Sequence, residues 1–341
     1  MQSFLDRSRF SPEQIQPHQT ILSNGTRVSV IDAGIIEFAP ANYQPSEVRH
    51  VVLSCGVHGN ETAPIEMCSD LVEGILNQSI IPQVKVQFQF ANLPAMNIGE
   101  RFVDLNMNRL FDGAHHHYEP GPETRRAAQL ECCTRTFFAE CGHRDLKFHY
   151  DLHTAIRDAK YPRFAVYPYI HGKPYSRQQI NWLASAGIQA ILLSHNPTTT
   201  YSYYTSKHCD AHAFTVELGK VRAFGHNNRA DFASSFEFLK HLLIDNQFNP
   251  ECDDSPIVFD IAQTVRRETE DFELHFADDT PNFTAFDQGY NLATAYSQSG
   301  KKEYPVLAKK EAIVFPNADV AIGQRALLTV VEVDLHDLEL I

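Results

Sequence analysis

Buried strands alternate with amphipathic helices through the first two-thirds of the chain. The stretch Val51–Cys55 is short, largely apolar and followed by a glycine, which is typical of a buried strand. Apolar residues then recur at helical spacing between residues 68 and 76, as on the inner face of a helix. The same reasoning predicts strands at 84–91, 147–151, 163–167, 190–193 and 213–217, and helices at 123–141, 176–186 and 229–244. This alternation predicts an α/β fold, a sheet with helices on both faces.

The pattern changes near residue 250. Residues 249–256 are polar and bounded by prolines, as in a linker between domains. Short β-rich runs follow, separated by turn residues and without a long helical pattern, at 257–265, 272–276, 304–308, 312–315 and 326–333. We therefore expect two domains, an α/β domain over residues 1–249 and a smaller all-β domain over residues 250–341.

The composition is that of an ordinary globular protein. Of 341 residues, 43% are hydrophobic and 21% are charged, as in most soluble domains. No apolar run approaches the roughly 20 residues of a membrane span, and no signal-like apolar stretch follows the charged N-terminus. The seven cysteines are scattered and contain no Cys-x-x-Cys pair, so neither a thiolate zinc site nor a disulfide framework is indicated. These features predict a cytoplasmic protein with reduced thiols.

The charge balance bears on possible partners. The chain carries 29 basic and 42 acidic residues, a formal net charge of −13. A nucleic-acid-binding protein would be expected to show a basic face, and none is visible in the sequence. An anionic small-molecule substrate would therefore need a few well-placed arginines to overcome the overall field. The sequence does not indicate the oligomeric state.

Two short motifs far apart in the chain carry candidate metal ligands. Residues 56–61 read Gly-Val-His-Gly-Asn-Glu and contain His58 and Glu61, and residues 150–154 read Tyr-Asp-Leu-His-Thr and contain His153. Two imidazoles and one carboxylate are the protein donors of a catalytic zinc site whose fourth position stays open for water. The sequence therefore predicts a metal site, provided that these three side chains converge.

Position, rather than spacing, selects these residues. His-x-x-Asp/Glu pairs also begin at His116, His275 and His336, so spacing alone selects nothing. His58, in contrast, follows the carboxyl end of a predicted strand, and His153 ends another. Ligands of open α/β sheets bind at this edge. The alternative is that these are ordinary polar residues in loops.

Two carboxylates near the predicted site have candidate roles. Asp151 lies two residues before His153 and could orient a metal-bound histidine, although it could equally cap the end of a strand. Glu217 ends a largely apolar strand, where a buried carboxylate is costly unless it is paired. It is the candidate for the proton acceptor that a zinc hydrolase needs. The alternative is an edge glutamate in water.

Residues 99–110 contain Arg101 and Arg109 among asparagine and aspartate residues. A guanidinium group can bind a carboxylate through two parallel hydrogen bonds, and it can stabilise a developing oxyanion. The alternative is ion pairing at the surface.

At these motifs the chain resembles a known family. Residues 56–67, 151–157 and 216–220 closely resemble the succinylglutamate desuccinylase/aspartoacylase branch of the zinc carboxypeptidase superfamily. The likeness runs over nearly the whole chain, including residues 314–317 and 321–323. Thr62-Ala63-Pro64 and Thr154-Ala155-Ile156-Arg157 favour the desuccinylases over aspartoacylase.

The resemblance implies a zinc-carboxypeptidase-like catalytic domain, a mixed sheet flanked by helices, over residues 1–249. It also implies one Zn²⁺ per chain held by His58, Glu61 and His153, with Glu217 as the catalytic acid and base. The implied reaction is hydrolysis of N-succinyl-L-glutamate to succinate and L-glutamate, the last step of the succinyltransferase route of arginine breakdown.

The resemblance also suggests substrate contacts. By analogy with aspartoacylase, Arg101 would polarise the scissile carbonyl, and Asn108 and Arg109 would bind a substrate carboxylate. The substrate's three carboxylates leave a role for Arg157 as well. Where the branch often reads Asp-Leu-Asn-Arg, this chain has Asn106 in place of the aspartate. Two alternatives are hydrolysis of another N-acyl amino acid, such as N-acetylaspartate, and a non-catalytic ligand-binding relative.

Overall fold

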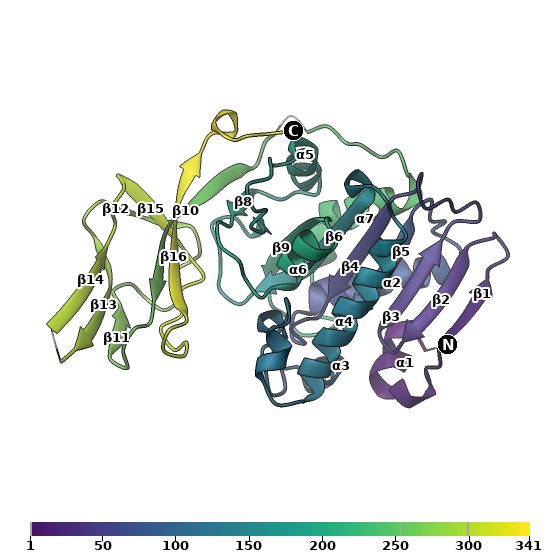
Figure 1. Cartoon of the computed structure of the whole chain (residues 1–341), viewed down its shortest axis with the longest axis horizontal. Coiled ribbons are helices and arrows are strands. Elements are labelled where there is room, and N and C mark those ends of the chain that lie inside the picture. The colour runs from purple at the N-terminus through teal and green to yellow at the C-terminus, as the bar shows by residue number, and fades with distance from the viewer. Residues whose placement is uncertain (1, 253, 299) are drawn as a thin grey trace.

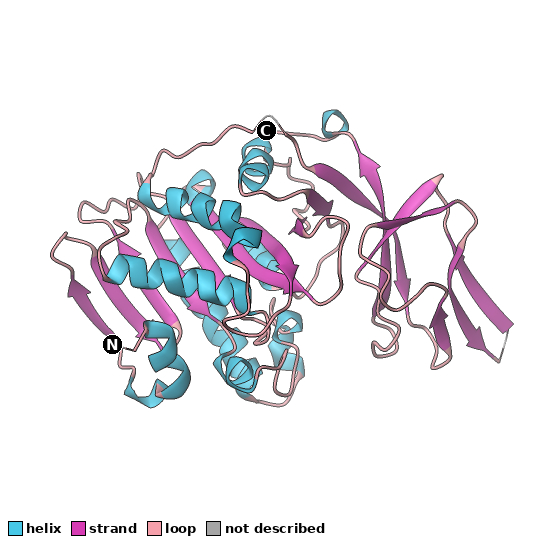
Figure 2. Ribbon diagram, turned by 180° about the vertical axis from the view of Figure 1, so that it is seen from behind, coloured by secondary structure: helices cyan, strands magenta, loops and turns pink. Residues whose placement is uncertain are grey.

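A computed structural model describes residues 2–252, 254–298 and 300–341. A 13-stranded mixed sheet runs through the molecule in the order β1-β2-β3-β5-β4-β6-β9-β7-β8-β10-β16-β15-β12, with a 3-stranded sheet, β11-β13-β14, at the far end (Figure 1). Helices cover the two faces of the N-terminal half of the large sheet (Figure 2). The predicted α/β architecture is confirmed.

Four parallel strands form the middle of the sheet. They lie in the order β5 (Lys85–Phe90), β4 (His50–Cys55), β6 (Lys147–Ala155) and β9 (His212–Lys220). Every residue of β4 and β5 is buried, because helices cover both faces. The carboxyl ends of these strands meet at one edge of the sheet, and the predicted site lies there.

Strands of the opposite direction make the sheet mixed. Beside β5 lies an antiparallel meander of β1 (His18–Ile21), β2 (Arg27–Asp32) and β3 (Ile35–Ala39). On the other side, β7 (Arg163–Tyr167) is antiparallel to β9, and β8 (Ala190–Leu193) is parallel to β7.

The helices form two layers with separate cores. One core contains residues of α1 (Phe4–Phe10), α2 (Thr62–Leu76), α3 (Leu93–Ile98), α5 (Arg177–Ser185) and α7 (Ala233–Ile244). The other contains residues of α4 (Pro122–Ala139) and α6 (Tyr201–His208). The helix predicted at 229–244 begins with one 3₁₀ turn, Arg229–Phe232, before α7. Helix α6, which carries buried tyrosines rather than an aliphatic stripe, was not predicted.

The C-terminal part is all β, as predicted, and it continues the main sheet. Strand β10 (Ile257–Arg266) pairs with β8 in parallel and with β16 (Arg325–Val333) in antiparallel orientation. Then follow β15 (Lys310–Val314) and β12 (Thr284–Asp287), while β11 (Phe272–Leu274), β13 (Asn291–Ser297) and β14 (Gly300–Pro305) form the small sheet. The strand expected at 304–308 instead ends at Pro305, whose nitrogen cannot donate to a ladder.

Two further expectations concern the whole chain. All seven cysteines are free thiols, in agreement with the predicted reduced state. Among the described residues, no helix has both the length and the apolar character needed to cross a membrane.

Candidate metal centre and active site

The turn between β4 and α2 carries the first two candidate ligands. Gly56 has φ +65°, a conformation that favours glycine. A Cβ on Gly59 would lie 2.2 Å from the carbonyl carbon of Ala95, so no larger residue fits at that approach. The Gly59 amide donates to the Arg101 carbonyl at 3.1 Å. Glu61 is the N-cap of α2, and the tight turn therefore presents His58 and Glu61 to one side.

His153 reaches the same point from β6. Its Cα partner on β9 is Glu217, and the register shifts between His153 and Ala155, as in a β-bulge that redirects a side chain. One donor atom from each of His58, Glu61 and His153 lies within 4.8 Å of the others, and all three residues are buried. The structure thus brings together the three residues predicted as metal ligands.

The contacts within this group suit a divalent cation. Glu61 places Oε1 2.8 Å from Nδ1 of His58 and Oε2 2.8 Å from Nδ1 of His153. Nδ1 of His58 nevertheless makes no hydrogen bond to any residue that the structure describes, so this nitrogen is free to bind a metal ion. Two imidazole nitrogens and a carboxylate oxygen are a zinc donor set, so the residues present fit a zinc ion.

Each histidine is held through its second nitrogen. Nε2 of His153 lies 2.9 Å from Oδ2 of Asp151, and Nε2 of His58 lies 3.0 Å from Oδ1 of Asn106. Hydrogen bonds of this kind fix the tautomer and the orientation of metal-binding imidazoles. The orienting role predicted for Asp151 agrees with its contact. Asn106 was noticed only as a departure from the family pattern, and nothing in the sequence linked it to His58.

The buried carboxylates of Glu61 and Asp151 concentrate negative charge around His153. Burial raises the pKa of Glu61, but the imidazoles of His58 and His153 outweigh this effect and hold it well below its usual range. Burial lowers the pKa of His153, but Asp151 and Glu61 raise it well above the usual value. The pair of carboxylates therefore favours a positive charge between them, which a metal ion would supply.

Glu217 lies beside this group on the neighbouring strand. It is 8% exposed, and its Oε2 makes no hydrogen bond within the described part of the chain. Burial and the charge of Glu61 raise the pKa of Glu217 to about 7, against the opposing charges of His153 and Arg101. A carboxyl group that titrates near neutral pH can both accept and donate a proton. The alternative of a solvent-exposed edge glutamate is therefore wrong.

Arg101 and the loop after it lie next to the cluster. Nη1 of Arg101 donates to Oε1 of Glu61 at 2.8 Å, and its side chain is 31% exposed. Asn108 is buried, and its Oδ1 accepts from the amide of Tyr201, the first residue of α6. Nη1 of Arg109 donates to the Asn108 carbonyl at 2.9 Å. Several donors of both arginines thus remain available to a ligand.

Arg157 has a different environment. Its guanidinium donates to the carbonyl of Thr280 at 3.1 Å and to that of Pro316 at 3.5 Å. Both acceptors belong to the C-terminal part of the chain. In this structure Arg157 therefore joins the loop after β6 to the C-terminal domain, and a substrate contact from it stays a prediction.

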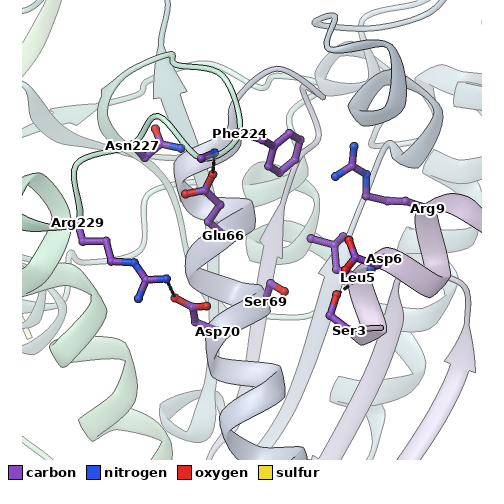
Figure 3. Close-up of a pocket in the computed structure, with 11 residues that line it drawn as sticks. Ser3, Leu5, Asp6, Arg9, Glu66, Ser69, Asp70, Phe224, Asn227 and Arg229 are labelled. Atoms are coloured by element: carbon purple, nitrogen blue, oxygen red, sulfur yellow. Dashed lines mark hydrogen bonds and ion pairs between the residues drawn. The ribbon is translucent and has the colours of Figure 1, made fainter. Parts of the chain in front are cut away.

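A separate hollow of about 420 Å³ lies between α1, α2 and the loop 221–229 (Figure 3). The amide of Gly225 donates to Glu66 at 2.6 Å, and Arg229 pairs with Asp70 at 2.8 Å. None of the predicted site residues lines it. Arg9 donates to the side chain of Asn97 and to the carbonyl of Met96, so the arginines and Glu66 of this hollow already have partners.

The same loop braces the active site. Oγ1 of Thr62 donates to the carbonyl of Arg222 at 2.7 Å and accepts from the side chain of Asn227 at 2.7 Å. Thr62 follows Glu61, and the loop follows the strand of Glu217. These bonds join the start of α2, beside Glu61, to the loop after the strand of Glu217.

Comparison with known proteins adds to this geometry. Residues 47–242 match the model of the succinylglutamate desuccinylase/aspartoacylase catalytic domain, and residues 254–333 match that of the AstE/AspA barrel-sandwich hybrid domain. A succinylglutamate desuccinylase of Idiomarina loihiensis is 47% identical over 331 residues, which are 96% of this chain and 94% of that protein.

Solved structures of the same name are similar throughout. One from Vibrio parahaemolyticus has a TM-score of 0.91 at 33% identity and covers 98% of this chain and 96% of its own. One from Chromobacterium violaceum has a TM-score of 0.85 at 36% identity and covers 98% of both chains.

Proposed function

This chain belongs to the succinylglutamate desuccinylase/aspartoacylase family, and we propose that it hydrolyses N-succinyl-L-glutamate with one zinc ion held by His58, Glu61 and His153. The activity itself, cleavage of the amide to succinate and L-glutamate, is supported by near-full-length relatives of that name. The observation that carries the zinc assignment is the buried His-Glu-His group beside Glu217.

The proposed reaction combines the effect of a bound zinc ion with proton transfer by Glu217. Zinc bound by this donor set would lower the pKa of a coordinated water and polarise a carbonyl oxygen. Glu217 accepts the proton of the attacking water, since it lies buried beside His153 with an unused oxygen. It then returns that proton to the departing glutamate nitrogen, as a group with a pKa near 7 can do.

Cationic side chains complete the reaction site. Arg101 stays bonded to Glu61 through one nitrogen and uses its other donors to stabilise the developing oxyanion. Asn108 and Arg109 bind a carboxylate of the substrate, and the hydrogen bond from the Tyr201 amide fixes the side chain of Asn108. The predicted cytoplasmic location and the domain boundary at 249/250 stay predictions.

The test is an amide-hydrolysis assay on N-succinylglutamate, with zinc content measured on the same sample. We expect turnover that a chelator abolishes and zinc restores, with about one zinc per chain. N-acetylaspartate serves as the comparison substrate, and a higher kcat/KM on it would reassign the substrate. A chain that binds zinc but hydrolyses neither compound would be a ligand-binding relative instead.

A further inference from the structure

Arg325 is a cation of the C-terminal domain without a partner of opposite charge. It is the first residue of β16, it is half-buried, and it pairs across the ladder with Arg266 of β10. Its guanidinium lies 5.4 Å from the centre of the Phe315 ring. No acidic side chain of the described residues lies within 4.0 Å of it. A half-buried guanidinium that lacks an anionic partner is a candidate for binding an anionic ligand.

A short series of packed rings connects Arg325 with the active site. Glu217 faces Phe164 across the β7–β9 ladder. The ring of Phe164 packs against that of Phe315 at a centroid distance of 5.7 Å, and the guanidinium of Arg325 lies over the Phe315 ring. Only the rings of Phe315 and Phe164 thus lie between this guanidinium and the strand that carries Glu217, although Arg325 is 108 positions away from Glu217 in the sequence.

Hydrogen bonds join the catalytic domain to the C-terminal domain near these rings. The amide of Asn282 donates to the Asp158 carbonyl at 2.8 Å, and the Lys160 amide donates to the Asn282 carbonyl at 3.0 Å. The amide of Phe315 donates to Oδ1 of the same asparagine at 2.8 Å. The loop that follows His153 and the strand end that carries Phe315 are thus joined, and Arg325 keeps its position relative to the site.

The electrostatics link Arg325 with the arginines of the catalytic domain. Burial lowers the pKa of Arg325 to about 10, and the charges of Arg109 and Arg266 add to the effect. Desolvation likewise lowers the pKa of Arg109, and the charge of Arg101 lowers it further. Repelling cations gather here in a protein with a net charge of −13. Such a cluster is stabilised when an anion binds between its members.

We infer that Arg325 is a substrate-binding residue supplied by the C-terminal domain, and that it binds one carboxylate of the substrate together with Arg109. This inference rests on the proposed function, because N-succinylglutamate is the anion considered. It gives the C-terminal domain a direct part in specificity. A substrate that lacks the contacted carboxylate leaves the two guanidinium groups facing each other without a counter-ion.

The experiment compares Arg325→Gln, Arg325→Lys and, as a matched control, Arg266→Gln. Arg266 is the exposed cross-strand neighbour, and its guanidinium donates to the Gly323 carbonyl. We expect Arg325→Gln to raise the KM for N-succinylglutamate about 10- to 100-fold, as for a lost charged hydrogen bond, with kcat lowered much less. Lysine should restore part of the affinity. Arg266→Gln should change KM less than about threefold, since it removes a nearby charge but no proposed substrate contact.

Substrate analogues identify the contact. Three analogues each carry an amide in place of one carboxylate of N-succinylglutamate. Arg325→Gln should leave the KM of one of them unchanged, because that analogue already lacks the partner of Arg325. Equal KM increases for the parent substrate and all three analogues would overturn the inference, as would no increase for any of them.

A binding measurement separates this inference from the proposed function. If the wild-type enzyme does not hydrolyse N-succinylglutamate, the proposed function fails, and calorimetric titration with succinate and with L-glutamate still tests Arg325. Weaker binding of either compound to Arg325→Gln than to Arg266→Gln supports the anion site. Identical affinities in the two variants refute it.

Discussion

Replacing Asp151 by asparagine is expected to weaken zinc binding without unfolding the protein. Asp151 is completely buried and accepts from Nε2 of His153 at 2.9 Å and from Oγ of Ser54 at 2.5 Å. Asparagine has the same shape and keeps one acceptor oxygen for His153, but it loses the charge. Neutralising such a partner typically costs about 10- to 100-fold in metal affinity, and we expect a loss in that range.

The protein should tolerate this change because the hydrogen bonds behind Asp151 can reverse direction. Ser54 Oγ also lies 2.8 Å from Nε2 of His149, whose Nδ1 lies 2.7 Å from Oγ1 of Thr205. With asparagine, the amide donates to Ser54, Ser54 donates to His149, and His149 donates to Thr205 from its other tautomer. Every group keeps a partner, so Asp151→Asn should destabilise the metal-free protein less than Asp151→Ala does, although the charge that stabilises the protonated His153 is lost.

Alanine at the same position provides the contrast. Asp151→Ala removes the acceptor and leaves buried polar groups unpaired, at about 1–3 kcal/mol for each. The assay is zinc competition against a chromophoric chelator, combined with urea unfolding of the metal-free proteins. Wild-type zinc affinity in Asp151→Asn would refute the orienting role. Equal destabilisation by asparagine and alanine would refute the reversal of the hydrogen bonds.

Three other changes test the rest of the site and the core. Glu217→Gln should lower kcat about 10²- to 10⁴-fold, as for loss of a general base, with zinc content unchanged; near-normal turnover would exclude its role. Gly59→Ala should reduce both zinc content and melting temperature, because the new Cβ meets the backbone at Ala95, and a fully loaded, equally stable variant would contradict the close approach. Burial lowers the pKa of His50 and of His212 from 6.5 to about 4, so the unfolded chain protonates both histidines before the folded protein does. Each histidine therefore contributes a loss of stability of roughly 1–2 kcal/mol as the pH falls from about 6.5 to 5. Glu217, whose pKa is raised to about 7, acts in the opposite direction, so the test compares urea unfolding of the metal-free wild type and of His212→Gln at pH 7 and pH 5. An identical pH dependence of the two proteins would refute this.

The sequence was most informative where local pattern and burial agree. The apolar strand before His58 and the strand that carries His153 were predictable because helices cover both of their faces. Two strand ends at one edge of a sheet then sufficed to bring His58, Glu61 and His153 together. The glycines around His58 supported the same tight turn.

Other parts depend on contacts that no local pattern contains. Helix α6 is mostly hydroxyl-bearing and aromatic, and its tyrosines are buried because the helix packs against α4 and against strands β6 and β9. Asn106 orients His58 across 48 positions of sequence. Arg325 feels the charge of Arg109, which lies 216 positions earlier in the chain. In each case the deciding partner lies far along the chain, and only folding brings it close.

The pairing of β10 with β8 covers an edge of the catalytic domain's sheet with a strand of the C-terminal domain. Every residue of β8, Ala190–Leu193, is buried, and without its neighbour this strand would expose an apolar, unpaired border. Unpaired apolar edge strands pair with other chains and cause aggregation. A truncated enzyme that stops before β10 would therefore be expected to precipitate even with all of its proposed zinc ligands intact.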